Sequence, residues 1–383
     1  MQVYLHYPYC ATLCPYCDFF SNTGPEDPAY AATIKHELSL WARHLKGPAT
    51  TVYFGGGTPG RMAPSLAAEI LLHIAQEFGL ASGAEITLEA NPDDIHVAGL
   101  REFSAVGINR LSLGVQSLDD KELQFLGRRH DAQQAIDAVA AARLAGFNNL
   151  SLDLIFGLPG QTEAGLTAML KRFLGLGSEH VSLYGLTIEP GTRFGREHAA
   201  GRLRELDRSL WLRMYGLVTE LAYNYGLRRY ETSNFAQPGF SGRHNRAYWR
   251  DGSFVGVGPG AHGQRRLRHG GVERRFNARS LPGWRESVSA WAKTGDFLAA
   301  NANGETLDAS QWLREASMLG LRDFDLGIDP QAWANSFGLA DSALMATVQQ
   351  LIKVGDLSEG KPHCLMPQAQ ARADDVSAAL LNA

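Results

Sequence analysis

Three cysteines lie within eight residues near the start of the sequence, and their types and spacing suit a metal or iron–sulfur site. Cys10, Cys14 and Cys17 follow the pattern C-x3-C-x2-C, while the fourth cysteine, Cys364, lies near the far end. Three thiolates are one short of the usual four ligands, so one coordination position stays open for chemistry. A zinc knuckle completed by His6 is the alternative, but no second C-x2-C or H-x3-H pair accompanies it. The spacing therefore favours an iron–sulfur cluster.

The residues around these cysteines belong to an alternating pattern of predicted strands and helices. Short apolar, β-rich segments are predicted as strands at Val3–Tyr7, Thr51–Gly55, Glu85–Glu89, Arg110–Gly114, Leu150–Phe156 and Val181–Leu186. Amphipathic segments between them are predicted as helices at Ala29–Lys46, Pro64–Phe78, Ala132–Ala145 and Thr162–Leu174. Such alternation predicts a parallel sheet flanked by helices, either open and doubly wound or curved into a barrel. Distinctive polar or glycine residues mark all six strands, and this favours the curved arrangement, whose strand ends share one rim.

The segment Tyr4–Phe19, which reads YLHYPYCATLCPYCDF, resembles the signature of the radical S-adenosylmethionine (SAM) enzymes. Within that family it is similar to the branch of the oxygen-independent coproporphyrinogen III dehydrogenase and the HemW-type heme chaperones. The likeness runs through essentially the whole chain, to Glu315–Arg322. It implies a partial (β/α)6 radical SAM barrel with one [4Fe–4S] cluster on the three cysteines. It also implies SAM on the fourth iron, where an electron from the cluster would cleave it to a 5′-deoxyadenosyl radical.

The same resemblance assigns a set of SAM-binding residues. Glycines allow the backbone to approach a ligand, carboxylates accept from hydroxyl or ammonium groups, and arginine pairs with a carboxylate. Taken singly, each of these residues is better explained as a strand-end cap, a tight turn, an ion pair or a core aromatic. The ordered set implied by the family comprises Tyr4, Tyr16, Gly56, Gly57, Thr58, Glu89, Gln116, Arg128 and Asp153.

Two features favour the chaperone branch. The dehydrogenase pattern carries a further cysteine two positions after the third, where this chain has Phe19. In addition, the segment from Arg243 to Trp249 resembles the HNxxYW motif that is associated with heme binding in the HemW-type proteins. This implies heme contacts from His244, Asn245, Tyr248 and Trp249. A histidine can ligate heme iron, but a histidine hydrogen-bonded in the fold, with the two aromatics in the core, explains the same residues.

The length of the chain predicts a barrel with a smaller partner domain. We expect the radical SAM barrel at residues 1–265, a connecting segment at 266–304 and a mostly helical, winged-helix-like domain at 305–383. The predicted C-terminal helices are Ala309–Leu319, Pro330–Phe337 and Ser342–Val354. A basic run from Arg265 to Arg275 is interpreted as a solvated loop.

Composition limits the classes of partner. The net charge of −4 and the pI of about 6.3 give no support for nucleic-acid binding. No long apolar run or secretory leader is evident, and clustered reduced thiols suit a reducing compartment, so a cytoplasmic protein is expected.

Three functions remain open at this stage. The first is a heme chaperone that delivers heme to heme-requiring proteins such as respiratory enzymes, with an electron donor and with membrane contact only through its acceptors. The second is a coproporphyrinogen III dehydrogenase, which the missing cysteine makes a less favoured reading. The third is a zinc-stabilised binding module.

Overall fold

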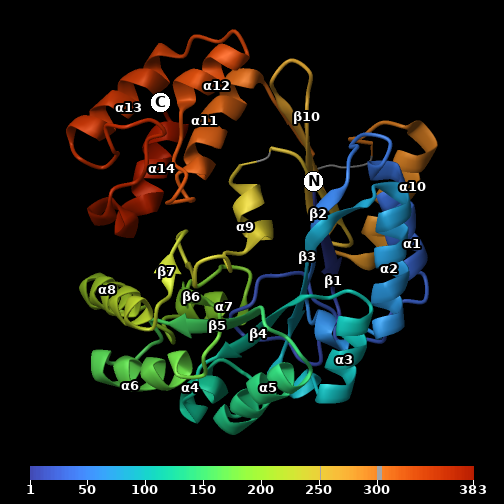
Figure 1. The fold of residues 1–383 in the computed structure, drawn as a ribbon, viewed down its shortest axis with the longest axis vertical. Helices are drawn as coiled ribbons and strands as arrows, with labels where there is room; N and C mark the ends of the chain where they lie inside the picture. The colour runs from blue at the N-terminus through green and yellow to red at the C-terminus, as the bar shows by residue number, and fades with distance from the viewer. Residues whose placement is uncertain (251, 300–303) are drawn as a thin grey trace.

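The sheet at the centre of the molecule carries six parallel strands in chain order. The structure, a computed structural model, describes residues 1–250, 252–299 and 304–383. The parallel strands are β1 (Gln2–Tyr7), β2 (Ala49–Gly56), β3 (Leu80–Ala90), β4 (Arg110–Gln116), β5 (Leu150–Phe156) and β6 (His180–Gly185). Each pairs with the next in parallel register, and Figure 1 shows that their direction changes markedly from β1–β3 to β4–β6. The six strands predicted from the sequence are thus confirmed, in the order of a partial barrel.

Helices cover the outer side of this curved sheet. They are α1 (Tyr30–Trp41), α2 (Pro64–Glu77), α3 (Val97–Ala105), α4 (Asp120–Phe125), α5 (Ala132–Leu144), α6 (Glu163–Leu174) and α8 (Arg208–Asn224). The short α7 (Arg193–Ala199) lies instead beside the cysteine loop, where Phe194 N donates to Pro15 O and the Phe194 ring packs near Ile155. In Figure 1, α1–α3 lie outside β1–β3, and α4–α6 lie outside β4–β6. Short 3-10 turns at Pro59–Arg61 and Pro92–Asp94 follow β2 and β3.

Alternation along the strands separates the core from the interior of the barrel. On β5, Leu152 and Leu154 are fully buried in the main hydrophobic cluster with helix residues. Asp153, between them, points to the other side and lines a cavity. Because side chains alternate along a strand, the apolar face packs on the helices while polar groups line the concave side. This places the chemistry-bearing residues inside the curve.

Further strands extend the sheet at both edges. β9 (Phe254–Val257) pairs in parallel with β1, and antiparallel pairing then adds β10 (His262–Arg266), β11 (Val272–Phe276) and β12 (Glu305–Leu307). β8 (Asn234–Ala236) and the two-residue β7 (Arg228–Arg229) follow β6. Among the described residues, β7 and β12 end the sheet, which is therefore open.

The basic run corrects one prediction. It forms the β10–β11 hairpin rather than a solvated loop. Helix α10 (Leu281–Thr294) packs on α1, and its Trp284 and Trp291 are buried in the main core. Arg275 of the hairpin is 1% exposed, because its guanidinium lies over Trp291 at 4.7 Å. Packing against residues distant in the sequence therefore buries the charge of Arg275, which the composition of the run predicted to be exposed to solvent.

The C-terminal helices have a hydrophobic cluster of their own. They are α11 (Ala309–Gly320), α12 (Pro330–Ser336), α13 (Ser342–Lys353) and α14 (Ala373–Leu381), with a 3-10 turn at Pro367–Arg372. The three predicted C-terminal helices are present, and α14 is an addition. The division of the chain at residues 265 and 304 stays a prediction.

Helix α9 (Arg243–Tyr248) lies between the two parts. On one side the backbone N–H groups of Arg243 and His244 donate to the carboxylate of Glu85 on β3. On the other side Arg246 makes two hydrogen bonds, of 3.0 and 2.9 Å, to the buried carboxylate of Asp323. This helix thus ties the barrel to the C-terminal part.

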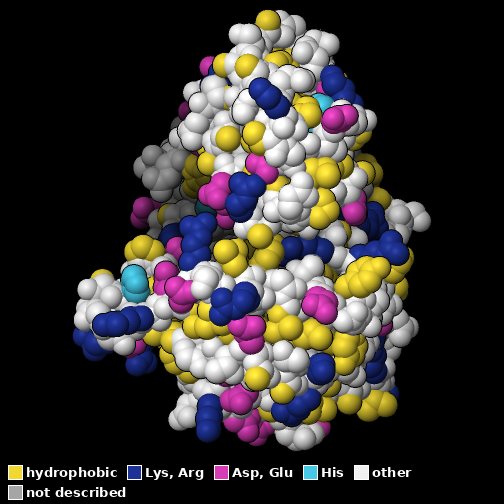
Figure 2. All heavy atoms as spheres, turned by 90° about the vertical axis from the view of Figure 1, so that its left-hand side faces the viewer, with side chains coloured by type: hydrophobic (Ala, Val, Ile, Leu, Met, Phe, Trp, Pro, Cys, Tyr) yellow, Lys and Arg dark blue, Asp and Glu magenta, His cyan; other side chains and the backbone are white. Residues whose placement is uncertain are grey.

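The surface shows no separation of charge on the face drawn in Figure 2. Lys, Arg, Asp and Glu side chains alternate over it, with hydrophobic side chains between them. In the described ranges, no helix has both the length and the apolar character needed to cross a bilayer.

Candidate functional site

One cavity, of about 810 Å³, gathers most of the residues singled out in the sequence. It lies at the carboxyl ends of the parallel strands, where a barrel fold places its active site. The predicted site residues that line it are Cys10, Cys14, Tyr16, Cys17, Gly56, Gly57, Thr58, Glu89, Gln116, Arg128 and Asp153. Residues separated by up to about 140 positions in the chain are therefore brought to one place, in the arrangement that a cluster with a neighbouring ligand would need.

The cysteines lie on the loop between β1 and α1. The loop is fixed at its base because Cys10 N donates to Asn22 O at 2.9 Å and Asn22 N donates to Pro8 O at 2.7 Å. Between the other two cysteines the chain turns, with Cys17 N donating to Cys14 O. Burial raises the pKa of the Cys17 thiol to about 11, so this sulfur would ionise at neutral pH only with a cation such as iron as its partner.

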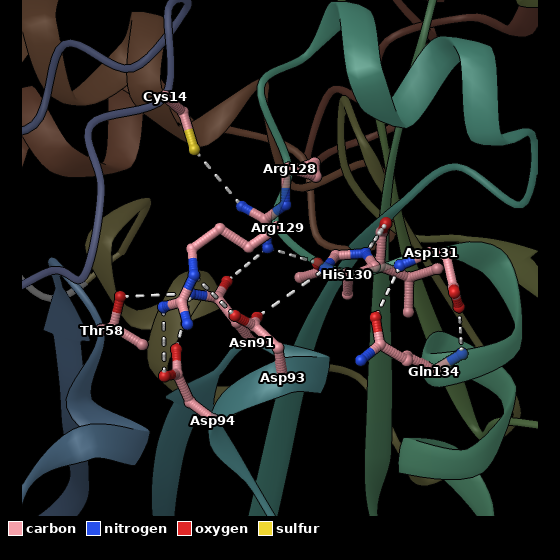
Figure 3. Close-up of polar contacts among 12 residues, drawn as sticks. Cys14, Thr58, Asn91, Asp93, Asp94, Arg128, Arg129, His130, Asp131 and Gln134 are labelled. Carbon is pink, nitrogen blue, oxygen red and sulfur yellow. Dashed lines mark hydrogen bonds and ion pairs between the residues drawn. The ribbon is translucent and has the colours of Figure 1, made fainter.

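Hydrogen-bond donors approach two of the sulfurs. Thr58 Oγ1 donates to Cys10 Sγ at 3.5 Å, and Arg128 Nη1 donates to Cys14 Sγ at 3.6 Å (Figure 3). Arg128 Nη1 also donates to the hydroxyl of Tyr16, and its Nε is buried without a partner among the described protein atoms. Asn91 connects the two donors, because it contacts both Thr58 and Arg128.

Two of the carboxyl groups on the cavity wall, Glu89 and Asp153, belong to the predicted SAM site. Glu89 accepts from Tyr53 Oη at 2.6 Å and from Gly56 N at 3.2 Å. Burial, with a contribution from Asp153, raises the pKa of Glu89 to about 7 against the lowering effect of those donors. Burial likewise raises the pKa of Asp153, although Ser112 donates to it at 3.1 Å. Both groups can thus accept hydrogen bonds from a polar ligand, and Glu89 is close to half-protonated at neutral pH.

The end of β4 is distorted where it meets the cavity. Gln116 has φ of 66°, the left-handed region that a non-glycine residue rarely adopts, and the β4–β5 register shifts between Gly114 and Gln116. Bulges of this kind re-aim a side chain beside a site. On β2, a Cβ on Gly56 would lie 2.7 Å from the ring of His6, so this glycine is required by packing as well as by its φ of 109°.

Tyr4 is the predicted SAM-site residue that does not line the cavity. Its ring stacks on Tyr53 at 6.2 Å, and its hydroxyl is 3.1 Å from His6 Nδ1. Tyr53 in turn donates to Glu89. Tyr4 therefore lies behind the cavity wall and supports it.

The predicted heme residues lie apart from the cavity, on and beside α9. His244 is buried, with Nδ1 2.7 Å from Thr51 Oγ1 and Nε2 2.9 Å from the hydroxyl of Tyr248. Burial lowers the pKa of His244 to about 3, so its ring is neutral. Trp249 Nε1 donates to Glu231 at 2.6 Å, and Asn245 is half-buried. In this conformation both ring nitrogens of His244 are engaged.

Several cavity residues were not assigned from the sequence. They include Asn91, Ser112 and Tyr184, with Thr187 and Glu189 after β6. Ser112 and Tyr184 face inward by the same alternation that aims Asp153, so the period-two pattern of the strands was the signal that could have found them.

The chemistry of this donor set fits the implied cluster and SAM. Three sulfurs lie on one loop with hydrogen-bond donors beside two of them, and hydrogen bonds to sulfur are the usual surroundings of iron–sulfur clusters. In the part of the chain that the structure describes, no three His, Cys, Asp or Glu side chains converge on a single ion position. A cube needs a different arrangement, because each thiolate binds a different iron.

Comparisons with known proteins agree with the family resemblance of the sequence. The sequence profile of the Radical SAM superfamily matches residues 4–173. The mouse protein named "Radical S-adenosyl methionine domain-containing protein 1, mitochondrial" is 37% identical, over 86% of this chain and 75% of its own length. "Heme chaperone HemW" of Bacillus subtilis is 36% identical over 68% of this chain and 70% of its own, and that of Mycobacterium tuberculosis is 38% identical over 68% of each.

Among solved structures, the coproporphyrinogen III oxidase HemN of Escherichia coli, a radical SAM enzyme, has a TM-score of 0.79 to this chain. The two are 18% identical, and the match covers 99% of this chain and 89% of the other. This likeness confirms the fold through both the sheet and the C-terminal helices.

Proposed function

Since this chain belongs to the radical SAM superfamily and, within it, to the branch of the HemW heme chaperones and HemN, we propose that it is a heme chaperone. It holds a [4Fe–4S] cluster on Cys10, Cys14 and Cys17, binds SAM beside it, binds heme, and transfers the heme to heme-requiring proteins. The observation that carries this proposal is the identity of 36–38% to relatives named heme chaperone.

The cavity residues divide into two groups in this proposal. Thr58, Tyr16 and Arg128 surround the sulfurs, whereas Glu89 and Asp153 offer acceptors to the hydroxyl and ammonium groups of SAM. When bound, the cluster supplies one-electron chemistry next to SAM. Gly56, Gly57 and Gln116 complete the SAM site, with Tyr4 as a support behind it.

Heme contact through His244, Asn245, Tyr248 and Trp249 stays a prediction. Ligation of iron by His244 requires the ring to release Thr51 or Tyr248, since each nitrogen has a partner. The alternative role for this histidine is to hold α9 against β2.

We further propose that the acceptors are respiratory or other heme proteins, that an electron donor reduces the cluster, and that membrane contact comes through the acceptors. The location in the cytoplasm is also a proposal, because the mouse relative carries "mitochondrial" in its name.

Anaerobic reconstitution followed by heme titration tests the proposal. We expect the wild type to take up heme stoichiometrically, and to yield no protoporphyrinogen when given coproporphyrinogen III and SAM. Cys14→Ser serves as the cluster-deficient control, because a hydroxyl is a poor ligand for iron. Formation of protoporphyrinogen by the wild type would replace the chaperone by a dehydrogenase.

The same titration decides the role of His244. A displaced Soret band in His244→Ala supports ligation of the heme iron. An unchanged band at full heme content assigns His244 to the packing of α9. Tyr248→Phe is the matched variant, since it frees Nε2 of His244 and removes a single hydroxyl.

A further inference from the structure

Asn91, which follows β3, joins the two side chains that donate to the cysteine sulfurs (Figure 3). Thr58 donates to Cys10, and Arg128 donates to Cys14. The amide of Asn91 bonds to both donors. One short side chain thus connects the surroundings of two of the three sulfurs.

The orientation of the Asn91 amide follows from the chemistry of its neighbours. A guanidinium can only donate, so Asn91 Oδ1 must face Arg128 Nη2. The amide nitrogen then points the other way, where it lies 3.2 Å from Thr58 Oγ1 and 3.3 Å from Asp94 Oδ2. Asp94, itself paired with Arg61 at 2.7 Å, can only accept while it is ionised, and this fixes the same orientation.

That orientation determines where the Thr58 proton points. A threonine hydroxyl has a single proton. Because Thr58 Oγ1 accepts from Asn91 Nδ2, its own proton is left to donate, and Cys10 Sγ lies 3.5 Å away. Thr58 is 3% exposed, so water does not compete freely for this proton.

The space around Asn91 holds the network in one arrangement. Arg128 Nη2 also donates to Gly114 O at 2.8 Å. A Cβ on Gly114 would lie 3.2 Å from Asn91 Oδ1 and 3.4 Å from Arg128 Nη2. A glycine at this position therefore leaves just enough room for the amide and the guanidinium to meet.

We propose that Asn91 is a positioning residue that directs the Thr58 hydroxyl at Cys10 and the Arg128 guanidinium at Cys14, and thereby raises the reduction potential of the cluster. Donors to the sulfurs stabilise the additional negative charge of the reduced state, so losing them favours the oxidised state. This inference rests on the proposed cluster site and is independent of heme delivery.

The experiment compares Asn91→Leu, Thr58→Val and the double variant with wild type, at equal iron and sulfide content. Asn109→Leu is the matched control, because the side chain of Asn109 bonds to the backbone of Ala84 and Ile86 in the middle of β3 and Asn109 is not among the residues that line the cavity. The readouts are the midpoint potential, followed by EPR, and the exchangeable proton couplings to the cluster by ENDOR after transfer to D2O.

We expect a more negative midpoint potential in both single variants and loss of one exchangeable proton coupling in each. The double variant should shift less than the two single shifts added together, because Asn91 acts partly through Thr58. An unchanged potential in Asn91→Leu, or strictly additive shifts, would overturn the proposal. Asn109→Leu should leave the potential and the couplings at their wild-type values, and an equal shift there would also overturn it.

If Asn91→Leu does not fold, Asn91→Asp tests the same proposal. Its carboxylate keeps an acceptor for Arg128 but turns the Thr58 proton away from Cys10, so the coupling should still be lost, and its persistence would contradict us. A wild type that never assembles iron and sulfide would refute the cluster assignment itself, which is a distinct result.

Discussion

At the scale of single residues, Glu89 changes its charge state close to neutral pH. Its pKa is raised to about 7 by burial, so the folded apo protein holds this proton more tightly than the unfolded chain does. Glu89 therefore lowers stability progressively as pH rises from about 4.5 to 7. We expect Glu89→Gln to remove this loss, with a gain above pH 7 of at most about 3 kcal/mol, because one side of the carboxyl faces the cavity.

Urea unfolding of the apo protein between pH 4.5 and 8 measures this effect. Glu102→Gln, an exposed carboxylate on α3, is the control and should follow the wild type. Parallel curves for Glu89→Gln and wild type would show that burial does not hold the proton.

Residue type alone predicted this site only at the cysteines, because cysteine is rare in this chain. The three clustered cysteines are recognisable from their spacing, whereas Glu89, Gln116 and Asp153 were predicted because their order matches a family pattern. Asn91 precedes a proline, and an Asn-Pro pair ordinarily indicates a turn. Its importance arises from neighbours 33 and 37 positions away, which local sequence does not reveal.

At the scale of elements, the β10–β11 hairpin depends on a buried cation. Arg275 Nη1 donates to Phe297 O at 2.9 Å, Nη2 donates to Ser287, and the guanidinium lies over Trp291. We expect Arg275→Met to lower the free energy of unfolding by about 2–4 kcal/mol, because it leaves buried acceptors unpaired. Chemical denaturation measures this, with exposed Arg268→Met of the same hairpin as a control near zero.

The hairpin also shows where composition misleads. A run of arginines indicates a solvated loop when each charge is considered alone. Here the strands pair antiparallel, and Trp291 of α10 lies against the guanidinium of Arg275. The parallel strands, by contrast, were predictable because each one carries its own apolar alternation.

At the scale of the molecule, α9 connects the barrel to the C-terminal helices through Asp323. This carboxylate is fully buried and accepts from Arg246 and Arg250. We expect Arg246→Met to expose α11–α14 to hydrogen exchange, with protection there reduced at least tenfold, as about 1.4 kcal/mol of lost coupling would give. The sheet should keep its protection.

Arg243→Met on the same helix is the comparison, because Arg243 donates to Gly83 O on the barrel side instead. Its C-terminal helices should exchange as in wild type. Uniform loss of protection in Arg246→Met, across sheet and helices alike, would mean that the two parts unfold as one unit.

Each parallel strand has an apolar face toward the helices and another face toward the cavity, and this division affects how a protein of this fold can diversify. Leu152 and Leu154 pack in the main hydrophobic core, whereas Asp153 between them faces the cavity. Substitutions at the inward-facing positions can therefore change which ligand the cavity binds, while the apolar core that stabilises the fold stays the same.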